Sequence, residues 1–598
     1  MILPLMQFHF QTGGIMTNKN IQLMMLLKRI ILLLVIQLVT ITCCAIQAQT
    51  FNQEAAFLQT DRSVYIAGET LYYKLDILDA DTKKHSERSK VGYIVLRSFN
   101  LLPTLKIRVK IDAGMAYGSI VLPETLLSGV YQFVGFTAAM KNYGEECFFH
   151  KDVVIANRFD KELQFKIVQP DSNVNNKIKF TELKPEIKTD KSIYGVREKV
   201  SVSLSRINSK GNVVVSVYED SKIPESYNLF VENLKQLKLF PTDKKVVTSY
   251  LFENKAKIMR GSVVDVSTDK CIPNAVVLLS CIDTIPDLQY ASTNSTGMFQ
   301  MLLPDYYNGK ELFLTIKDVP AGQHWKIKIE DEFALTEQWT PSLFHDNFNN
   351  KEYLLKSQNI VYIDKSYPLK KVFREDPLNR TGFICPQFYH CSVRSLYPDD
   401  FVTLDDFPEI VVELLPQINI SMVKSKYVAR IFNNTTKMYF NNEPAIFLDG
   451  VYVDDINKII GLGSEQIKRI DVIDTERIFG DLVFPGVISI LSKTNEIRNT
   501  KPANQSLRIM NDFEHTGEKF VPINPNAILN KNIPYFKQLL YWNPDMKMNG
   551  TDTTDFEFYT SDNTANYIIE INGFTEDGIP ICTSRSIEVN NQINNSEK

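Results

Sequence analysis

The sequence predicts a mainly β protein, built of tandem β-sandwich domains and one small α/β domain. Apolar and polar residues alternate with period two in most of the patterned segments after residue 48, as in 70–80 and 129–138. Gly, Pro, Asn and Asp separate these runs, which is typical of antiparallel strands joined by turns. The chain has 598 residues, too many for one hydrophobic core. Several domains of about 100 to 150 residues each are therefore expected.

The composition is that of a folded protein without a strong charge preference. Hydrophobic residues make up 44% of the chain and charged residues 23%, which argues against global disorder. The formal net charge of −4 gives no basic field that would attract nucleic acid. We therefore expect no nucleic-acid partner.

The N-terminal residues have the parts of an export signal. Two basic residues, Lys28 and Arg29, precede the apolar run 30–41, and small residues follow as far as Ala48. The run is shorter than the roughly 20 residues that a membrane-spanning helix needs. We therefore expect residues 1–48 to be a signal peptide, with its start at the first or a later methionine. The mature chain would then be exported and have no integral membrane span.

The ten residues 60–69, TDRSVYIAGE, belong to the first domain. Asp and Ser favour turns, Val-Tyr is a strand fragment, and Ala-Gly-Glu forms a tight turn before the strand at 70–80. Together with VLPETLLSGVYQFVGFTAAMKNYGEECFFHKDVVIAN (121–157), this stretch resembles the macroglobulin-like β-sandwich of exported Bacteroidetes proteins, an Ig-like architecture. The resemblance covers residues 51–157.

The same phrase recurs at 189–198 as TDKSIYGVRE, with Thr, Asp, Ser, Tyr and Glu in the same places. It predicts a second macroglobulin-like sandwich over 180–250, in which the Tyr fills the core and the Glu closes a turn. Macroglobulins that trap proteases carry a Cys-Gly-Glu-Gln thioester motif. The nearest match here is Gly-Glu-Glu-Cys at 144–147, which has the wrong order and no Gln. Covalent trapping is therefore not expected.

Residues 257–330 predict a third β-sandwich. KIMRGSVVDVSTDKCIPNAVVLLS (257–280) and ASTNSTGMFQMLLP (291–304) contain three expected strands, a Pro-Asn-Ala turn before the second and a Gly-containing turn before the third. These segments resemble the carboxypeptidase regulatory-like domain. That domain is a structural companion of an enzyme, so the resemblance implies no active site.

The region 331–420 has the weakest pattern and is expected to connect domains. Its best helix is LDDFPEIVVELLPQ (404–417), with Asp405 or Asp406 as the N-cap and Pro408 in the first turn. Adjacent aspartates in such a loop usually cap a helix or form a turn. We therefore do not expect them to act as a catalytic pair.

Three pieces of the segment 421–494 occur in a recognisable order: a strand ending in LDGV (448–451), then SEQIKRIDVI (464–473), then FPGVISILSK (484–493). Together they resemble the plug domain of TonB-dependent outer-membrane receptors. A receptor barrel of about 22 strands, at roughly 9–11 residues each, needs about 200 residues or more. Only 105 residues follow Lys493 (598 minus 493). We therefore expect a plug-like domain without a pore of its own.

The last patterned region predicts a C-terminal β-sandwich over 530–592. QLLYWNP (538–544) and ANYIIEINGFTEDGIP (565–580) alternate as strands do, and Asn-Pro and Asp-Gly mark turns. The region resembles the C-terminal sandwich of the same exported multidomain proteins.

Few residues qualify as functional sites. The candidates for calcium are three hard oxygen ligands close in sequence, Asp449, Asp454 and Asp455, although their spacing fits no defined loop. HExxH, GxSxG, GxxxxGK[ST] and GxGxxG are all missing from the sequence. The sequence HTGE at 515–518 matches part of a zinc carboxypeptidase ligand set, but no later His completes it. We expect no catalytic residue, no cofactor and no enzymatic activity.

Cysteines offer two further candidate sites. In an exported chain the close pairs can oxidise to disulfides or remain as buried free thiols. These pairs are Cys271 with Cys281, and Cys385 with Cys391.

These observations favour a non-enzymatic scaffold or interaction protein in the envelope of a Gram-negative cell, in the periplasm or at the outer membrane. A protein partner is implied, and the plug resemblance indicates a TonB-dependent β-barrel transporter. One alternative is therefore an accessory transport component whose barrel is a separate chain. Another alternative is a macroglobulin-type surface binder or protease inhibitor without a thioester, which requires an exposed and cleavable bait segment.

Overall fold

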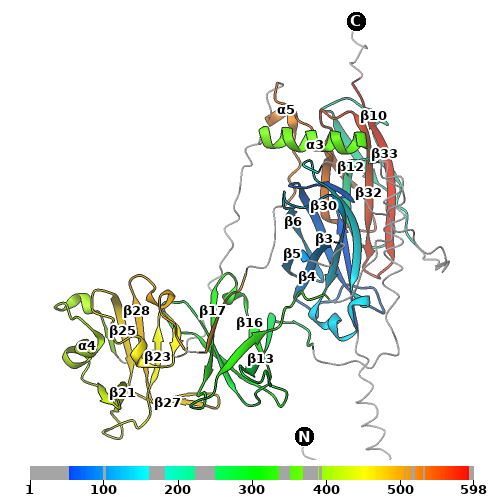
Figure 1. Ribbon diagram of the computed structural model, residues 1–598. Helices are drawn as coiled ribbons and strands as arrows, with labels where there is room; N and C mark the ends of the chain where they lie inside the picture. The colour runs from blue at the N-terminus through cyan, green and yellow to red at the C-terminus, as the bar shows by residue number, and fades with distance from the viewer. Residues whose placement is uncertain are drawn as a thin grey trace, which may run out of the picture. The chain divides into compact units, whose positions relative to one another are not determined.

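The computed structural model describes residues 53–98, 103–160, 182–221, 250–335, 351–367, 388, 394–503, 505–512, 519–528 and 532–591. Their helices and strands all belong to one compact unit, Glu54–Lys598. They form a mainly β protein of three β-sandwiches and one small α/β unit, which confirms the predicted fold class (Figure 1). The predicted signal peptide, 1–48, lies outside the described residues. Within the described ranges, no helix combines the length and apolarity needed to cross a membrane.

The first sandwich packs the sheet β1-β3-β6 against the sheet β2-β8-β7-β4-β5. Its strands are β1 (Glu54–Thr60), β2 (Val64–Ile66), β3 (Thr70–Asp79), β4 (Val91–Ser98), β5 (Pro103–Lys110), β6 (Met115–Val121), β7 (Gly129–Phe136) and β8 (Phe149–Ala156). Two short 3-10 helices, η1 (Ala138–Asn142) and η2 (Glu145–Cys147), join β7 to β8. Neighbouring strands are antiparallel, except that β2 runs parallel to β8. The two sheets bury one continuous apolar core.

The second sandwich has the same connectivity, but its strands come from two distant segments. The first segment supplies β9 (Ile187–Thr189), β10 (Ile193–Tyr194), β11 (Lys199–Leu204) and β12 (Gly211–Glu219). The second segment supplies β30 (Leu539–Met548), β31 (Thr554–Tyr559), β32 (Ala565–Thr575) and β33 (Pro580–Val589). They form the sheets β31-β11-β9 and β10-β33-β32-β12-β30, with β10 parallel to β33. Strands β9–β12 thus repeat β1–β4, and β30–β33 repeat β5–β8.

The prediction of two separate sandwiches, over 180–250 and 530–592, is wrong. Strand β12 shows the reason, because all nine of its residues are buried and it pairs with both β30 and β32. The N-terminal half alone would leave this central strand without either neighbour. Figure 1 shows β12 (teal) in one sheet with β30, β32 and β33 (orange to red). The residues between β12 and β30 are therefore an insertion at the place of the short β4–β5 connection.

The third sandwich lies within this insertion. Its sheets are β16-β13-β18 and β15-β14-β17-β29. The strands are β13 (Lys257–Asp265), β14 (Val276–Cys281), β15 (Leu288–Ser292), β16 (Met298–Leu303), β17 (Glu311–Lys317), β18 (Trp325–Ile329) and β29 (Ser506–Met510), with η3 (Asp305–Tyr307) between β16 and β17. Strand β29 pairs antiparallel with β17 and covers its edge. The sandwich therefore does not end at residue 330, as predicted, but is completed by a strand far along the chain.

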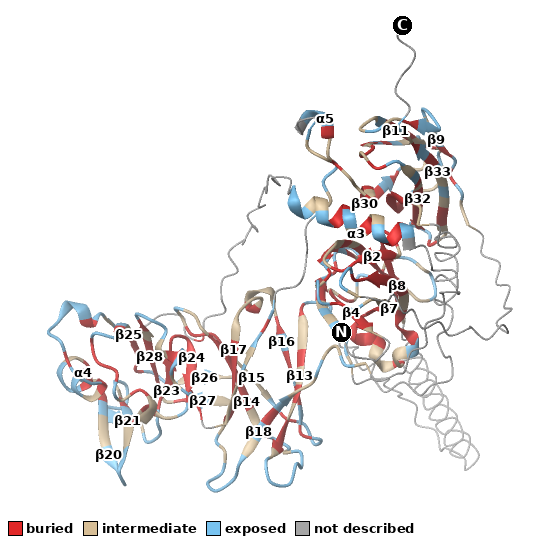
Figure 2. Ribbon diagram, turned by 45° about the horizontal axis from the view of Figure 1, so that its top comes forward, coloured by how far each residue is buried: buried red, intermediate tan, exposed pale blue. Residues whose placement is uncertain are grey.

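The α/β unit is inserted in turn between β18 and β29. Its main sheet is β19-β25-β28-β23-β24, with smaller sheets β20-β21-β22 and β26-β27. The elements are β19 (Arg394–Leu396), η4 (Pro398–Asp400), α4 (Phe407–Leu414), β20 (Ile418–Val423), β21 (Lys426–Asn433), β22 (Met438–Tyr439), β23 (Ala445–Leu448), β24 (Val451–Val453), η5 (Ile456–Lys458), β25 (Ile467–Ile473), β26 (Arg477–Phe479), β27 (Leu482–Phe484), β28 (Val487–Ser492) and η6 (Glu496–Arg498). Buried residues fill β23 and β28 (red in Figure 2).

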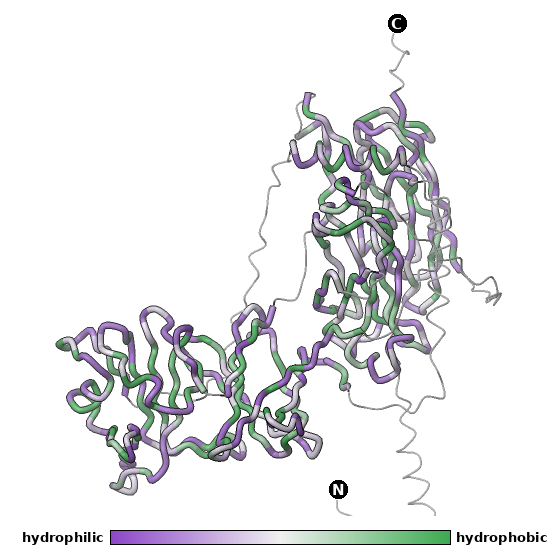
Figure 3. Tube along the Cα trace, in the orientation of Figure 1, coloured by the Kyte–Doolittle hydropathy of each residue, from purple (hydrophilic) through white to green (hydrophobic). Residues whose placement is uncertain are grey.

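The predicted boundary of this unit, 421–494, starts too late. Strand β19 pairs with β25, and α4 contributes Phe407, Ile410 and Val411 to the same core as the sheet. The helix predicted over 404–417 is confirmed as α4, and Asp406 is its N-cap, accepting from the Glu409 amide at 2.9 Å. Figure 3 shows hydrophobic positions, in green, along the strands of each module.

Helix α3 (Lys351–Ser366), which the sequence analysis did not identify, packs on the first sandwich. Its residues Tyr353, Leu354 and Val361 join a cluster with β2 and β8. The same helix reaches the second sandwich, where Lys356 pairs with the buried Glu219 at 2.8 Å. Helix α3 therefore ties the two repeated sandwiches together. A further short helix, α5 (Pro525–Ile528), lies beside the second sandwich.

Candidate functional site

The first copy of the repeated phrase folds into a closed polar loop. The Tyr65 hydroxyl donates to the Asp61 carboxylate at 3.0 Å, and Glu69 accepts from the Ile66 amide at 2.6 Å. Arg62 is buried between these acids, 3.1 Å from Glu69. Burial raises the pKa of Asp61, although Arg62 opposes that effect. The side chains of Asp61, Arg62, Tyr65 and Glu69 thus pack against one another, largely away from solvent.

The second copy repeats this geometry. The Tyr194 hydroxyl donates to Asp190 at 2.8 Å, and Glu198 accepts from the Gly195 amide at 2.6 Å. Tyr194 is buried in the core of the second sandwich, as Tyr65 is in the first. The predicted roles of the Tyr and the Glu are confirmed. The phrase is therefore a structural device that closes the loop before the third strand of each sandwich.

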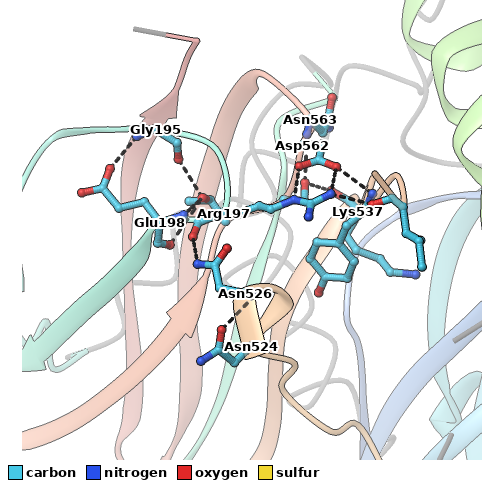
Figure 4. A network of polar contacts seen from close by, with 12 residues as sticks. Gly195, Arg197, Glu198, Asn524, Asn526, Lys537, Asp562 and Asn563 are labelled. Carbon is cyan, nitrogen blue, oxygen red and sulfur yellow. Dashed lines mark hydrogen bonds and ion pairs between the residues drawn. The ribbon is translucent and has the colours of Figure 1, made fainter. Parts of the chain in front are cut away.

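One position of the phrase has acquired a separate role in the second copy. Arg197 stands where the first copy has Gly68, and both have positive φ, 55° and 90°. A positive φ is unfavourable for arginine, but its guanidinium pairs with Asp562 at 2.5 Å and donates to the Ile533 carbonyl at 2.6 Å. Figure 4 shows this pair and the Asn526 side chain, which donates to the Arg197 carbonyl. Arg197 thus joins the two halves of the second sandwich.

The calcium candidate Asp449 is used for loop closure. It is fully buried, and its carboxylate accepts from the Ser492 amide at 2.7 Å, the Ser492 hydroxyl at 2.8 Å and the Ile497 amide at 3.1 Å. Three donors from the end of β28 and the start of η6 therefore occupy this carboxylate. It holds the chain where it leaves the central sheet.

The other two calcium candidates also have local partners. Asp455 is the N-cap of η5, where it accepts from the Asn457 amide at 2.9 Å. Asp454 forms an ion pair with Lys458. In the part of the chain that the structure describes, no group of three His, Cys, Asp or Glu side chains could hold a metal ion. The three aspartates are therefore not brought together as a calcium site.

Of the two alternatives left open for Cys271 and Cys281, the structure has free thiols and no disulfide. Cys281 ends β14, whereas Cys271 bridges to Val264 of β13 in the opposite sheet. Stacked sheets lie about 10 Å apart, and a disulfide needs Cα atoms within about 7 Å. Burial raises the pKa of the Cys281 thiol to about 12, so this thiol is unreactive. The pair Cys385 and Cys391 and the sequence 515–518 lie outside the described residues.

A tight turn joins the α/β unit to the third sandwich. Asp449 and Gly450 connect β23 to β24, and both have positive φ, 50° and 85°, as a two-residue type I′ hairpin requires. The Asp449 carbonyl accepts from the Asp283 amide at 3.0 Å. The Tyr452 amide donates to the Ser280 hydroxyl at 3.2 Å. The turn therefore lies directly against the end of β14.

An apolar cluster is shared across this junction. Leu278 and Leu288 of the third sandwich pack with Phe447, Phe484 and Val487 of the α/β unit. Burying large apolar side chains between two modules favours one fixed arrangement over a flexible link. The α/β unit is thus held at its turn and by a common core.

Exposed apolar side chains mark the other side of the α/β unit. We call five of them the apolar hairpin surface: Val412, Met422, Val423, Met438 and Tyr439. They come from α4, β20 and β22. Other residues of α4 and β20 pack in the core of the unit, whereas both residues of β22 are exposed. Val412 is 75% exposed, Met438 66% and Met422 63%. Figure 2 shows the exposed residues of β20 in pale blue. Four of the five side chains lie on the small sheet, Met422 and Val423 at one end of β21 and Met438 and Tyr439 at its other end, and Val412 lies on α4. Large exposed apolar side chains that gather on one unit are typical of an interaction surface.

A buried carboxyl group, Glu253, links the first and third sandwiches. Its two oxygens lie 2.9 and 3.1 Å from the Tyr93 hydroxyl, and one of them accepts from the Ile258 amide at 2.7 Å. Burial raises its pKa to about 7, and Glu332 acts in the same direction. This carboxyl group therefore changes its charge near neutral pH.

The raised pKa predicts a loss of stability as the pH rises. Between about pH 4.5 and 7 the folded state binds a proton at Glu253 that the unfolded state releases, so stability falls across this window. Glu253→Gln keeps a neutral hydrogen-bonding group. We expect this variant to match the wild type at pH 5 and to be more stable by about 2–3 kcal/mol at pH 8. Thermal unfolding of both proteins at pH 5 and pH 8 tests this. A stability difference between the variant and the wild type that is the same at both pH values would contradict it.

No protein-family model matches the chain, and no curated protein matches it. Among solved structures, the chain is similar to Escherichia coli alpha-2-macroglobulin activated by porcine elastase, with 7% identity, a TM-score of 0.22 and coverage of 90% of this chain and 43% of that chain. The native conformation of Escherichia coli alpha-2-macroglobulin has 9% identity and a TM-score of 0.23, and the match covers 90% of this chain and 40% of that chain. Salmonella alpha-2-macroglobulin reacted with methylamine has 6% identity and a TM-score of 0.15, and the match covers 90% of this chain and 23% of that chain. The chain thus spans less than half the length of these macroglobulins, and its fold is assigned from its own strand topology.

The residues that build the junction were only partly visible in the sequence. Asp449 was singled out, but as a calcium ligand, and its contacts with β28 and with Asp283 were missed. The available signal was the Asp-Gly pair between two apolar runs, which is a strong indicator of a hairpin turn. Ser280 and Asp283 carry no such signal, because their roles depend on contacts with a distant segment.

Proposed function

We propose that this chain is a non-enzymatic interaction protein of the bacterial cell envelope, exported to the periplasm or the outer membrane. In this proposal, macroglobulin-like sandwiches form a scaffold that presents the α/β unit to a protein partner. The proposal rests on how the α/β unit is attached to the third sandwich. One side shares a core with the third sandwich, while the apolar hairpin surface on another side stays exposed.

The roles of the acidic side chains also favour binding over catalysis. The aspartates that attracted attention in the sequence cap helices, close loops or form local ion pairs. Carboxylates that are occupied in this way are not free to act as general acids or nucleophiles. The plug resemblance of the α/β unit makes a TonB-dependent β-barrel transporter, as a separate chain, our favoured partner. The chain would then be an accessory component of nutrient uptake.

Site-specific photocrosslinking in intact cells tests this proposal. We expect a crosslinker at Met422 or Met438 to capture an envelope protein. The matched control is Val266 in the third sandwich, which is 52% exposed and lies outside the apolar hairpin surface. With the crosslinker at Val423 instead, Met422→Asp together with Met438→Asp should abolish capture while the melting temperature changes by about 1 °C or less, because exposed positions contribute little to stability.

The identity of the captured protein separates the alternatives. A β-barrel transporter supports the transport role, and a different envelope protein supports a scaffold for another assembly. Capture of a protease, with cleavage inside this chain and loss of protease activity, would support the macroglobulin-type inhibitor. Equal labelling at the control and hairpin positions would contradict the proposed surface.

A further inference from the structure

A polar pocket of about 260 Å³ lies where the first sandwich meets the third. The first sandwich contributes Tyr93, Arg108 and Lys141 to its wall, and β13 contributes Lys257 and Arg260. Basic side chains therefore converge on the pocket from two modules. The carboxylates around it decide whether any of these cations remains available to a ligand.

Most of the charged groups around the pocket are already paired. Glu332 accepts from Arg108 at 2.7 Å and pairs with Lys257 at 2.8 Å. Arg108 also donates to the backbone carbonyl of the exposed Asp512 at 2.9 Å. Asp331, at the rim, pairs with a neighbouring lysine of β5 at 2.7 Å. These contacts occupy the cations nearest the first sandwich.

Arg260 differs from the other cations. Its Nε and Nη2 atoms are buried and have no hydrogen-bond partner among the described residues. Its guanidinium lies 4.8 Å from the centre of the Tyr250 ring, which orients the planar group without satisfying its N–H donors. Buried donors are nearly always satisfied in folded proteins, so this exception requires an explanation.

Four basic and four acidic side chains line the pocket, and three of the acids, Glu330, Asp331 and Glu332, form ion pairs with cations other than Arg260. Lys141 lies against the same Tyr250 ring, with its Nζ 5.4 Å from the ring centre. Glu330 accepts from the Tyr250 hydroxyl at 2.7 Å and is 3.9 Å from the Lys141 Nζ. Burial lowers the pKa of Lys141, and Arg260 adds to this effect. An anion bound beside Arg260 would reduce the repulsion between Arg260 and Lys141 and would accept hydrogen bonds from the unsatisfied Arg260 donors.

We propose that this pocket binds a small oxyanion, a phosphate or a carboxylate, through the guanidinium of Arg260 with support from Lys141. The fork of an arginine matches the paired oxygens of either group. A volume of about 260 Å³ is small compared with the roughly 300–1,000 Å³ of sites for larger ligands. The ligand is therefore a small free ion or acid. This site is independent of the apolar hairpin surface.

Calorimetric titration of the full chain tests the proposal with two probes, inorganic phosphate and succinate. Both are titrated at constant ionic strength, with chloride as the background anion, so that general screening is equal. We expect Arg260→Gln to weaken binding at least tenfold. Arg430→Gln, in an exposed position of β21, is the matched control and should change binding less than twofold. Arg260→Lys keeps the charge but removes the fork, so an intermediate loss is expected.

The pattern of outcomes identifies the ligand class. Binding of phosphate alone assigns a phosphate site, binding of succinate alone assigns a carboxylate site, and binding of both assigns a general oxyanion site. The proposal is overturned if neither probe binds the wild type, or if Arg260→Gln binds as tightly as the wild type. Thermal unfolding without any probe shows that each variant is folded before its titration is interpreted.

Discussion

Replacing Gly450 with alanine is expected to destabilise the protein by about 3–4 kcal/mol and to loosen the α/β unit from the third sandwich. A Cβ atom at this position would lie 2.8 Å from the amide nitrogen and the carbonyl oxygen of Asp283, and 2.9 Å from the carbonyl oxygen of Cys281. These are backbone atoms, which cannot move aside as the end of a side chain can. The φ of +85° adds strain of about 1 kcal/mol for any residue other than glycine.

Gly322 supplies the matched control for this substitution. Its φ of +81° is nearly the same, but nothing lies within 4 Å of the position its Cβ would take. Gly322→Ala should therefore show the backbone strain alone, about 1 kcal/mol. Urea unfolding measures both variants, and limited proteolysis reports whether the segment after β14 becomes accessible. Equal losses for the two variants would show that the turn does not dock tightly on β14.

The same junction separates what sequence patterns can predict from what they cannot. Alternation identified the strands of the first sandwich, and capping rules placed α4 and its Asp406 cap, because these features depend on residues close together in the chain. The contact of Gly450 with Asp283 depends on two segments far apart in sequence. Local patterns carry no information about such a meeting.

The split second sandwich escaped prediction for a related reason. Each half has clear strands, but alternation does not say which distant strand will pair with β12. A comparison of the two copies offered a clue. The first sandwich has eight strands, β1–β8, whereas only four described strands of the second, β9–β12, precede the change of character at residue 257. The missing four had to lie elsewhere.

Helix α3 could not have been identified from amphipathic periodicity. Its buried residues Tyr353, Leu354, Ser357, Ile360 and Val361 lie on one face, but the apolar residues Leu355 and Tyr362 are exposed on other faces, so the sequence shows no single apolar stripe. Arg260 could not have been found, because nothing in its local sequence shows that its side chain lacks an acceptor. Unsatisfied groups are properties of the packed structure and appear only when all the neighbours are known.

Removing Asp76 is expected to cost about 3–5 kcal/mol, because it would leave Lys74 as an uncompensated charge inside the protein. Both side chains are almost completely buried, and the Lys74 Nζ lies 3.1 Å from the Asp76 carboxylate. His85 lies 2.9 Å from the same carboxylate. The Lys74 ammonium also donates to Asn212 at 2.7 Å, which joins the first sandwich to the second. The pair therefore supports the contact between the two repeated modules.

A double-mutant cycle separates the pair from its surroundings. Asp76→Leu should be the most damaging variant, and adding Lys74→Met should recover about 2 kcal/mol, because the buried charge is then gone. The exposed pair Lys188–Glu186 is the control, and Glu186→Ala should cost less than about 1 kcal/mol. A double variant no more stable than Asp76→Leu would show that the buried charge of Lys74 does not destabilise the protein when Asp76 is absent.

The acid dependence of this pair gives an independent check of the same argument. Burial alone would raise the pKa of Asp76, but Lys74 and His85 outweigh it and the pKa is lowered. A lowered pKa in the folded state means that the unfolded chain takes up a proton first as the pH falls. The contribution of Asp76 is therefore complete at neutral pH and is lost only as the pH falls below the ordinary carboxyl range. The stability difference between the wild type and the double variant should stay constant from pH 8 to pH 5 and shift toward the double variant in stronger acid.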